Sequence, residues 1–452
     1  MGSEIISKDL KYFWHPCSQM KDYEIFPPIT VEKARGSYLY TTDGEKIMDA
    51  ISSWWCKSLG HSHPRIKKAV KRQIDNFEHI ISANTCNRTL SELSERLCNI
   101  CPGLDKVFYA DNGSAAVEIA LKMSLQYHKN MRNQRKTKFA SFKNGYHGET
   151  ILALSAGDCG IYSEPFRPIM TEFAKIAGIP YVSGKGDPKW NSMPELMWKK
   201  TEKQLDKLKD KLSAIIFEPI VQGAGGMKIY SPELLKKLRK WTIENNVHLI
   251  ADEIMTGFGR TGKMLACEHA GITPDLACLS KGLTAGWAPM SAVLCGTPFY
   301  NAFYGDYSEG RAFLHSSTYC GYAIGAAAAL ETLKIFEEEK ICEQVEKRSC
   351  EIRRILENVA AETGALRNIR SLGFIAAADI VDPHTGKPFE KDKRAGFEFF
   401  RIAMKNGAFL RPLGDTVYIL PPLNTPPKVL DELSNIIIKS MKPLVLRLYR
   451  KK

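Results

Sequence analysis

The sequence predicts an α/β fold in which a sheet with helical crossovers is followed by a smaller α+β unit. Short apolar runs alternate with helical patterns until about Gly305, and this alternation is typical of such a sheet. Beyond Gly305 helical patterns dominate, with a few further apolar runs. The chain has 452 residues, of which 44% are hydrophobic and 25% charged, so it is globular and long enough to bury a large core.

Each expected element follows from a local pattern. Six apolar runs are expected to form strands, at 106–110, 138–142, 214–219, 247–251, 276–279 and 292–295. Helices are expected between them at 115–129, 199–211 and 232–245. The last of these has Ser231 as its N-cap and Pro232 at its first position. In the second unit we expect helices at 323–339 and 343–363 and strands at 373–380 and 416–420, joined by the N-terminal 50 residues.

The charge and the cysteines favour a cytoplasmic protein that binds neither nucleic acid nor a membrane. The formal net charge is +13, but the basic residues are scattered, and those at 199–211 are interleaved with Glu and Asp as on a solvated helix. No apolar run approaches the roughly 18 residues of a membrane span, and the N-terminus lacks the apolar region of a secretory signal. The twelve irregularly spaced cysteines are expected to be reduced thiols, with no metal bound.

The residues just after the predicted strands are the candidate functional residues, because ligands of open α/β sheets bind beyond the carboxyl ends of the strands. A small-residue turn that contains Gly113 and Ser114 opens a helix, and such a turn can bind a phosphate. Tyr146 lies in a glycine-flanked segment after the next strand, and a glycine-rich stretch at 221–226 follows the third. Asp252 and Lys281 end two further strands.

An acid and a lysine at neighbouring strand ends have a specific use in pyridoxal 5'-phosphate chemistry. The lysine amine condenses with the cofactor aldehyde, and the carboxylate keeps the pyridine nitrogen protonated, so that the ring can accept electrons. The turn at Gly113 and Ser114 would take the phosphate, and an aromatic ring would cover the cofactor face. Singly, Asp252 and Lys281 could be a structural acid and a surface lysine; together with the glycine-rich turns they favour the cofactor site.

Four other motifs favour different chemistry but lack its context. Residues 257–262 match the dinucleotide pattern G-x-G-x-x-G but open no clear helix. The same stretch continued to Lys263 matches a phosphate loop, yet Met264 stands where a Mg²⁺-binding Ser or Thr is needed. Cys98 and Cys101 form a C-x-x-C without a second pair, and the loop with His61 and His63 has no cysteine partner. We expect core thiols and an ordinary loop there.

The stretch from Ala251 to Gly286, ADEIMTGFGRTGKMLACEHAGITPDLACLSKGLTAG, resembles the signature of the class III pyridoxal-phosphate aminotransferases. The resemblance extends from about Trp14 to Pro422. It implies fold type I, with a mostly parallel seven-stranded sheet domain at 53–338 and a small α+β domain built from 1–52 and 339–452. Trp14-His15-Pro16, residues 52–55 and residues 218–226 are similar to the branch of the class that aminates 8-amino-7-oxononanoate in biotin biosynthesis.

The resemblance also implies roles for single residues. Lys281, Asp252 and Tyr146 would be catalytic, and Tyr146 would stack on the pyridine ring. Gly113 and Ser114 would bind the phosphate, with Ser317 and Thr318 reaching it from the second subunit of a homodimer. The substrate would contact the residues Trp54, Trp55, Tyr146, Lys281, Ser316 and Arg411, of which Arg411 would bind a carboxylate. Cys17, Glu149 and Ser317 depart from the pattern, which has Tyr, Asp and Pro there.

The resemblance implies S-adenosylmethionine as the amino donor of 8-amino-7-oxononanoate, because an aromatic pair suits adenine and a sulfonium cation. Lysine is the alternative donor, with Glu149 as the acid for its distal ammonium. A further alternative is another ω-amino acid aminotransferase of this class, acting on ornithine, 4-aminobutyrate or β-alanine. A nicotinamide-dependent dehydrogenase and a phosphate-loop NTPase, which would both use residues 257–263, remain as alternatives from other classes.

Overall fold

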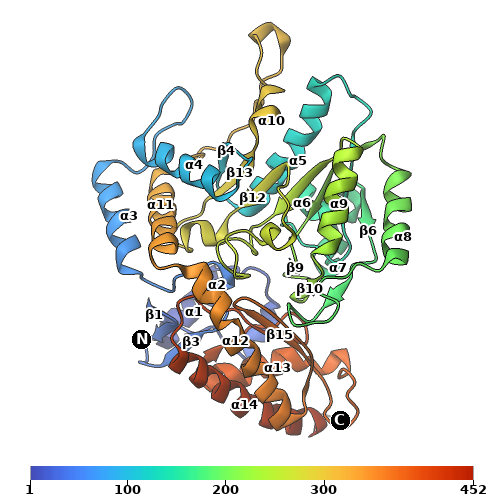
Figure 1. Ribbon diagram of the computed structural model, residues 1–452. Coiled ribbons are helices and arrows are strands. Elements are labelled where there is room, and N and C mark those ends of the chain that lie inside the picture. Colours follow the sequence, from blue (N-terminus) through green and yellow to red (C-terminus); the bar gives the residue numbers. More distant parts are fainter. Residues whose placement is uncertain (1, 451–452) are drawn as a thin grey trace.

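The computed structural model describes residues 2–450, which form a large unit around a seven-stranded sheet and a smaller unit below it (Figure 1). Only β13 runs antiparallel to its neighbours, while the other strands are parallel to one another. The expected mostly parallel sheet is therefore confirmed. In spatial order the strands are β4 (Lys106–Ala110), β13 (Ser291–Cys295), β12 (Leu276–Leu279), β11 (His248–Asp252), β8 (Leu212–Phe217), β5 (Lys138–Phe142) and β6 (Phe173–Ile176).

Helices cover both faces of this sheet because its strands are apolar on both faces. In β8, Ile215 and Phe217 pack toward one hydrophobic cluster, while Ala214 and Ile216 pack toward another, as the two-residue period of a strand requires. The helices of the large unit are α3 (Pro64–Asn76), α4 (Arg88–Ile100), α5 (Gly113–Asn130), α6 (Ile151–Ala156), α7 (Gly160–Ser163), α8 (Glu195–Asp206), α9 (Glu233–Glu244), α10 (Thr297–Asn301) and α11 (Ala323–Glu338).

The smaller unit combines both ends of the chain. In its four-stranded sheet, of order β1-β2-β3-β16, the C-terminal β16 pairs in parallel with the N-terminal β3. A second sheet has the order β14-β15-β17, and a third, of order β7-β10-β9, lies nearby. The remaining strands are β1 (Val31–Arg35), β2 (Tyr38–Thr41), β3 (Lys46–Asp49), β7 (Tyr181–Val182), β9 (Val221–Gln222), β10 (Lys228–Tyr230), β14 (Leu366–Leu372), β15 (Ile375–Ile380), β16 (Ala408–Phe409) and β17 (Thr416–Ile419).

The other helices are α1 (Gly2–Tyr12), α2 (Ser52–Trp55), α12 (Ile341–Thr363), α13 (Ala395–Lys405) and α14 (Pro427–Arg450). Short 3₁₀ turns lie at Met20–Glu24, Glu164–Ile169, Ala266–Ala270, Lys281–Thr284, Tyr307–Glu309 and Lys391–Lys393. The expected domain boundaries after residues 52 and 338 remain predictions.

Several sequence-based bounds need correction. The lysine-rich helix was expected at 199–211, but α8 spans Glu195–Asp206 and is followed by a turn. The strand expected at 214–219 lies two residues earlier, and the strand expected at 247–251 continues to Asp252. Pro232 occupies the N-cap position of α9 rather than the first helical position. The seventh strand of the sheet, β6, and the first strands of the smaller unit were not predicted individually.

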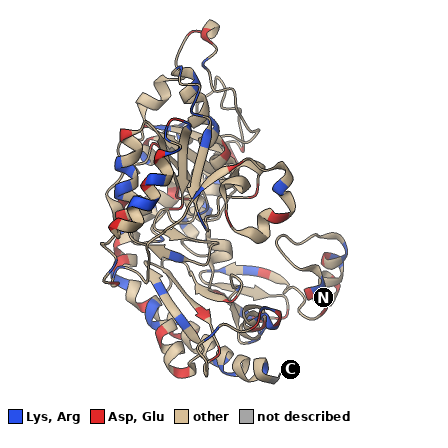
Figure 2. Ribbon diagram, turned by 90° about the vertical axis from the view of Figure 1, so that its right-hand side faces the viewer, with Lys and Arg blue, Asp and Glu red and all other residues tan. Residues whose placement is uncertain are grey.

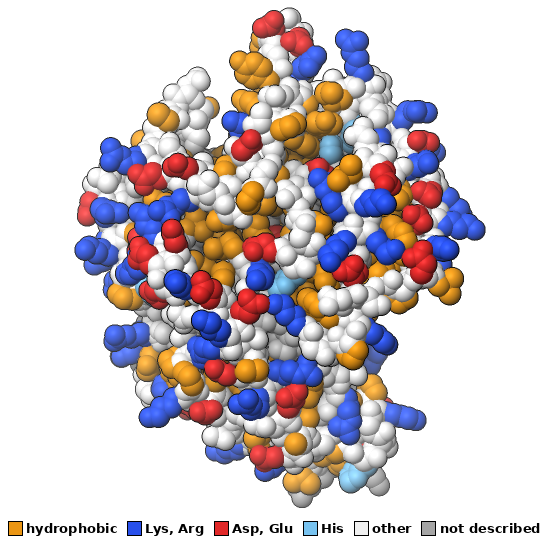
Figure 3. Space-filling model, in the orientation of Figure 1, with side chains coloured by type: hydrophobic (Ala, Val, Ile, Leu, Met, Phe, Trp, Pro, Cys, Tyr) orange, Lys and Arg blue, Asp and Glu red, His pale blue; other side chains and the backbone are white. Residues whose placement is uncertain are grey.

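The surface charge is mixed. Figure 2 and Figure 3 show Lys and Arg interleaved with Asp and Glu over both units. Within residues 2–450 no helix is both long and apolar enough to cross a membrane. All twelve cysteines are free thiols, as expected.

Candidate active site

The candidate residues gather at one edge of the large sheet because parallel strands end there together. In the spatial order β12, β11, β8, β5, the strand ends present Lys281, Asp252, Glu218 and Tyr146. The N-terminus of α5 reaches the same edge, since Gly113 lies against Ile254, two residues beyond β11. The structure therefore brings the predicted Lys281, Asp252 and Tyr146 together at one edge of the sheet.

The N-terminus of α5 forms a cradle in which glycine is required. Asn112 caps the helix by accepting a hydrogen bond from the Ala115 N–H (3.0 Å), and the Ser114 hydroxyl accepts one from the Glu149 N–H (3.2 Å). A Cβ at Gly148 would lie only 2.1 Å from Ser114 Oγ, and Gly148 has φ +120°. An open helix N-terminus with a serine hydroxyl and no blocking side chain fits a phosphate group.

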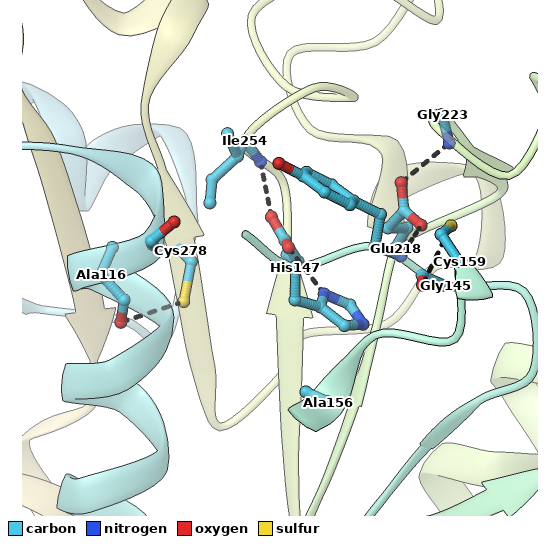
Figure 4. Close-up of polar contacts among 12 residues, drawn as sticks. Ala116, Gly145, His147, Ala156, Cys159, Glu218, Gly223, Ile254 and Cys278 are labelled. Atoms are coloured by element: carbon cyan, nitrogen blue, oxygen red, sulfur yellow. Dashed lines mark hydrogen bonds and ion pairs between the residues drawn. The ribbon is translucent and has the colours of Figure 1, made fainter. Parts of the chain in front are cut away.

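Asp252 is buried, at 4% exposure, and His147, which Figure 4 labels, fixes its position. Asp252 Oδ2 lies 2.7 Å from His147 Nδ1, and Oδ1 accepts the Ile254 N–H at 3.2 Å. His147 Nε2 is buried without a hydrogen-bond partner among the described residues. The sequence analysis assigned no role to His147. Its place beside Tyr146 at a strand end was the only signal that could have singled it out.

Glu218 is a second buried acid that the sequence analysis did not single out. Its two carboxyl oxygens accept the N–H groups of Tyr146 (2.9 Å) and Gly223 (2.8 Å), as Figure 4 shows for Gly223. Burial, and then repulsion from Asp252, raise the pKa of Glu218 to about 8. At neutral pH Glu218 is therefore mostly protonated, which limits the negative charge beside Asp252.

Lys281 is the lysine that these acids face. It begins the 3₁₀ turn after β12 with φ +40°, and its Nζ lies 4.8 Å from the centre of the Trp55 ring. Burial lowers the pKa of Lys281, while Asp252 and Glu218 oppose that shift. A lowered pKa makes the neutral amine more abundant, and the neutral amine is the form that attacks an aldehyde.

Tyr146 is held at both ends. Its backbone N–H donates to Glu218, and its hydroxyl donates to Glu149 Oε1 at 3.0 Å. The Tyr146 ring packs edge-on against Tyr162, with 5.8 Å between ring centres. Burial and the nearby Glu149 carboxylate raise the pKa of Tyr146, so the phenol stays neutral. These contacts hold a flat aromatic ring at the same edge as Asp252.

Trp54 and Trp55 lie in a left-handed turn, because Ser52, Ser53, Trp54 and Trp55 all have positive φ, between 44° and 75°. Left-handed geometry costs roughly 1–2 kcal/mol per non-glycine residue. Trp55 is buried, and its indole N–H donates to the Tyr418 hydroxyl at 3.0 Å. Trp54 is 45% exposed, and the Arg411 guanidinium lies 5.2 Å from its ring centre.

Besides its contact with Trp54, the Arg411 guanidinium donates a hydrogen bond to the Cys17 carbonyl. The Cys17 thiol in turn donates to the Tyr162 hydroxyl (3.8 Å). Adjacent tryptophans therefore lie against the lysine at one end and an arginine at the other, with Cys17 and Tyr162 at the arginine end.

Of the expected residues Ser316, Ser317 and Thr318, Ser317 contacts the segment beside the cradle, because Asp111 directly precedes Asn112, the N-cap of α5. Ser316 and Thr318 are exposed, and the Ser317 hydroxyl donates to Asp111 Oδ1 at 2.9 Å. Their expected contacts with a second subunit remain predictions.

The glycine-rich stretch at 257–262 forms a packed hairpin. The N–H groups of Phe258 and Gly259 donate to the carbonyls of Met264 (2.7 Å) and Lys263 (3.1 Å). A Cβ at Gly259 would lie 2.9 Å from the Phe336 ring. These glycines serve the hairpin and its packing, so the stretch does not form a dinucleotide or phosphate loop.

The sheet, the helix cradle and the facing Lys281 and Asp252 define a pyridoxal 5'-phosphate-dependent transferase of fold type I. A family model described as aminotransferase class-III matches residues 19–441, and the chain belongs to this family. Pyridoxal 5'-phosphate is the cofactor of the family, and the cradle at Gly113, Ser114 and Gly148 fits its phosphate.

Within this family, the chain is similar to curated relatives that share one name. The chain is 41% identical to the adenosylmethionine-8-amino-7-oxononanoate aminotransferase of Helicobacter pylori over 92% of both chains. It is 36% identical to that of Geobacter sulfurreducens over 96% of both. The crystal structure of the Methanocaldococcus jannaschii enzyme of the same name superimposes with a TM-score of 0.90, at 32% identity, over 98% of this chain and 99% of that one.

An ω-transaminase from Pseudomonas jessenii in complex with PMP superimposes with a TM-score of 0.89, at 26% identity, over 99% of this chain and 100% of that one. The resemblance to class III aminotransferases is therefore confirmed.

Proposed function

We propose that this protein transfers an amino group from S-adenosylmethionine to 8-amino-7-oxononanoate, giving 7,8-diaminononanoate for biotin biosynthesis in the cytoplasm. The observation that carries the proposal is the tryptophan pair between Lys281 and Arg411. The acceptor is a long apolar chain that ends in a carboxylate, and an aromatic wall that ends in a guanidinium suits it. The names of the curated relatives support the same substrate.

In the proposed reaction, pyridoxal 5'-phosphate supplies an aldehyde and an electron-accepting ring. Gly113 and Ser114 would bind its phosphate, and Tyr146 would cover the ring. His147 Nδ1 orients Asp252, whose carboxylate holds a proton at the pyridine nitrogen. Lys281 Nζ, as a free amine, would remove the proton from the substrate carbon and return it as general acid–base.

S-Adenosylmethionine is the proposed donor because Trp54 offers an exposed aromatic face at the mouth of the site. A groove of about 870 Å³ begins at Tyr162, which packs against Tyr146, and runs toward Arg370 and Asp379. One observation favours lysine as the second candidate: Glu149 is exposed beside Tyr146, where its carboxylate could take a distal ammonium.

The donor is tested by mixing holoenzyme with one donor at a time, without acceptor, and following the visible absorbance of the lysine-bound cofactor. We expect S-adenosylmethionine to abolish that absorbance in a single turnover, and lysine, ornithine, 4-aminobutyrate and β-alanine to leave it. If lysine alone removes the absorbance, the assignment of S-adenosylmethionine as donor is wrong. The assignment of the acceptor would still be tested separately. Failure to aminate 8-amino-7-oxononanoate with any donor would refute the proposed function.

The homodimer belongs to the same proposal. Ser317 and Thr318 would reach the phosphate of the partner site. Exposed apolar side chains on the surrounding segment support an interface there: Tyr304, Tyr307, Leu314 and Tyr319. Light scattering of the purified holoenzyme should give twice the mass of the chain, and a monomer at assay concentration would refute this part.

A further inference from the structure

We infer that Asp49 and His61 are positioning residues for the acceptor pocket, because they hold the left-handed turn that carries Trp54 and Trp55. The inference rests on the proposed function for the identity of the acceptor. The sequence analysis treated His61 as part of an ordinary loop, and Asp49 was not considered.

The turn needs an external support because no glycine relieves its backbone. Its four residues, Ser52 to Trp55, lack the conformational freedom that makes positive φ inexpensive. The support comes from Asp49, at the end of β3. Asp49 Oδ1 accepts the Ser53 N–H (2.9 Å), and Oδ2 accepts the Ser53 hydroxyl (2.7 Å). One carboxylate therefore binds the turn at two points.

His61 completes this support. Its Nε2 lies 2.8 Å from Asp49 Oδ2, and its own backbone is fixed by two hydrogen bonds to Gly36 in the β1–β2 connection. Asp49 is 1% exposed. Burial alone would raise the pKa of Asp49, but hydrogen bonds from His61 and Ser53 more than offset it and keep the pKa below its ordinary value. The Asp49 carboxylate is thus ionised, and both of its oxygens accept hydrogen bonds.

The C-terminal part of the chain holds the other side of the turn. The Ser52 hydroxyl donates to the Leu420 carbonyl at 2.7 Å, and the Leu420 N–H donates to the Ala50 carbonyl at 2.8 Å. The turn is therefore clamped between Asp49 and the end of β17.

A shift of this turn would move both tryptophans together. Trp55 would leave Lys281 and Tyr418, and Trp54 would leave Arg411, so the wall for the acceptor chain would lose its alignment. The cofactor cradle would stay in place, because it is built on the strand ends of the large sheet. Substitution of Asp49 or His61 should therefore weaken acceptor binding and leave cofactor binding unchanged.

The test compares His61→Ala, His61→Gln and Asp49→Asn with the wild-type holoenzyme. His61→Gln keeps an N–H donor for Asp49 and serves as the conservative variant. Asp275→Asn is the matched control, because Asp275 also accepts a backbone N–H (Leu249) and pairs with Arg239, but lies at the opposite end of the sheet strands. The readouts are cofactor affinity, steady-state kinetics with 8-amino-7-oxononanoate, and hydrogen–deuterium exchange of peptides covering residues 50–60.

In His61→Ala and Asp49→Asn we expect the KM for the acceptor to rise about tenfold or more, since small misplacements of binding groups have effects of this size. Cofactor affinity should stay within about twofold of wild type, and exchange should accelerate at residues 50–60. His61→Gln should restore most of the KM. Asp275→Asn should leave both the KM and this exchange unchanged.

An unchanged acceptor KM in folded Asp49→Asn, or an equal rise in Asp275→Asn, would overturn the inference. If wild-type protein fails to aminate the acceptor, the proposed function is wrong, and the exchange data then decide separately. Faster exchange confined to residues 50–60 would support the role of the pair in holding the turn, and unchanged exchange would refute it.

Discussion

Replacing Gly148 by alanine should weaken cofactor binding, because the added methyl group would occupy the phosphate cradle. The new Cβ would lie 2.1 Å from Ser114 Oγ and 2.8 Å from Ser114 Cβ, so Ser114 must move. The φ of +120° at residue 148 also disfavours any side chain. The cost to binding is at least the hydrogen bond between the Ser114 hydroxyl and the phosphate.

A hydrogen bond to a charged group contributes about 1.5–3 kcal/mol. Its loss corresponds to a roughly 10- to 150-fold weaker affinity for pyridoxal 5'-phosphate. The assay is a titration of apoprotein with cofactor, followed by visible absorbance, after thermal unfolding has shown that the variant is folded. Gly186→Ala is the control, because a Cβ at Gly186 meets nothing within 4 Å. A folded Gly148→Ala protein that binds cofactor within twofold of wild type would refute the assignment of the cradle.

Three further predictions concern the lysine, the arginine and two buried histidines. Lys281→Ala should abolish turnover, while the protein still binds cofactor without a covalent bond. Borohydride should then fail to attach the cofactor covalently to the protein. Residual transamination would show that another lysine acts. Arg411→Ala should raise the KM for the acceptor about tenfold or more, because the charge-assisted pair with the substrate carboxylate is lost. Cofactor affinity should change little. An unchanged KM would show that the substrate carboxylate binds elsewhere. Burial lowers the pKa of His128 to about 4 and that of His248 well below its ordinary value, so the folded state binds these protons less readily than the unfolded state. The contribution of His128 to stability should therefore fall as the pH drops from about 6.5 towards 4, by roughly 3 kcal/mol. Glu218, with its raised pKa, has the opposite effect over this range, so the test is urea unfolding of wild type and His128→Gln side by side. A stability difference between the two proteins that does not change with pH would contradict the burial argument.

The sequence predicted the part of the site that depends on strand order. Asp252 and Lys281 end adjacent parallel strands, so their proximity follows from the sheet alone. Ser114 could likewise be placed, because a small-residue turn before a helical pattern marks a helix N-terminus. These inferences needed only local patterns and one rule about sheet edges.

The remaining features depend on tertiary contacts that leave no local pattern. The contact of His147 with Asp252 joins residues 105 positions apart. The left-handed turn at Ser52–Trp55 contains no glycine and is imposed by Asp49 and Leu420. The edge strand β6 has only four residues, of which Lys175 is one, so its apolar pattern is too short to recognise.

The pairing of β3 with β16 has a consequence for biosynthesis. Met48 is paired with Ala408, so about 360 residues must be added before the N-terminal strand meets its partner. At about 5–20 residues per second, translation of that length takes roughly 20–70 seconds. During this interval the apolar Ile47 and Met48, which are buried in the finished protein, lack their final cover and are available to chaperones. Leu420, which holds the tryptophan turn, is made later still. The aromatic wall is therefore the last part of the site to form, after the lysine and its neighbouring acids have already left the ribosome.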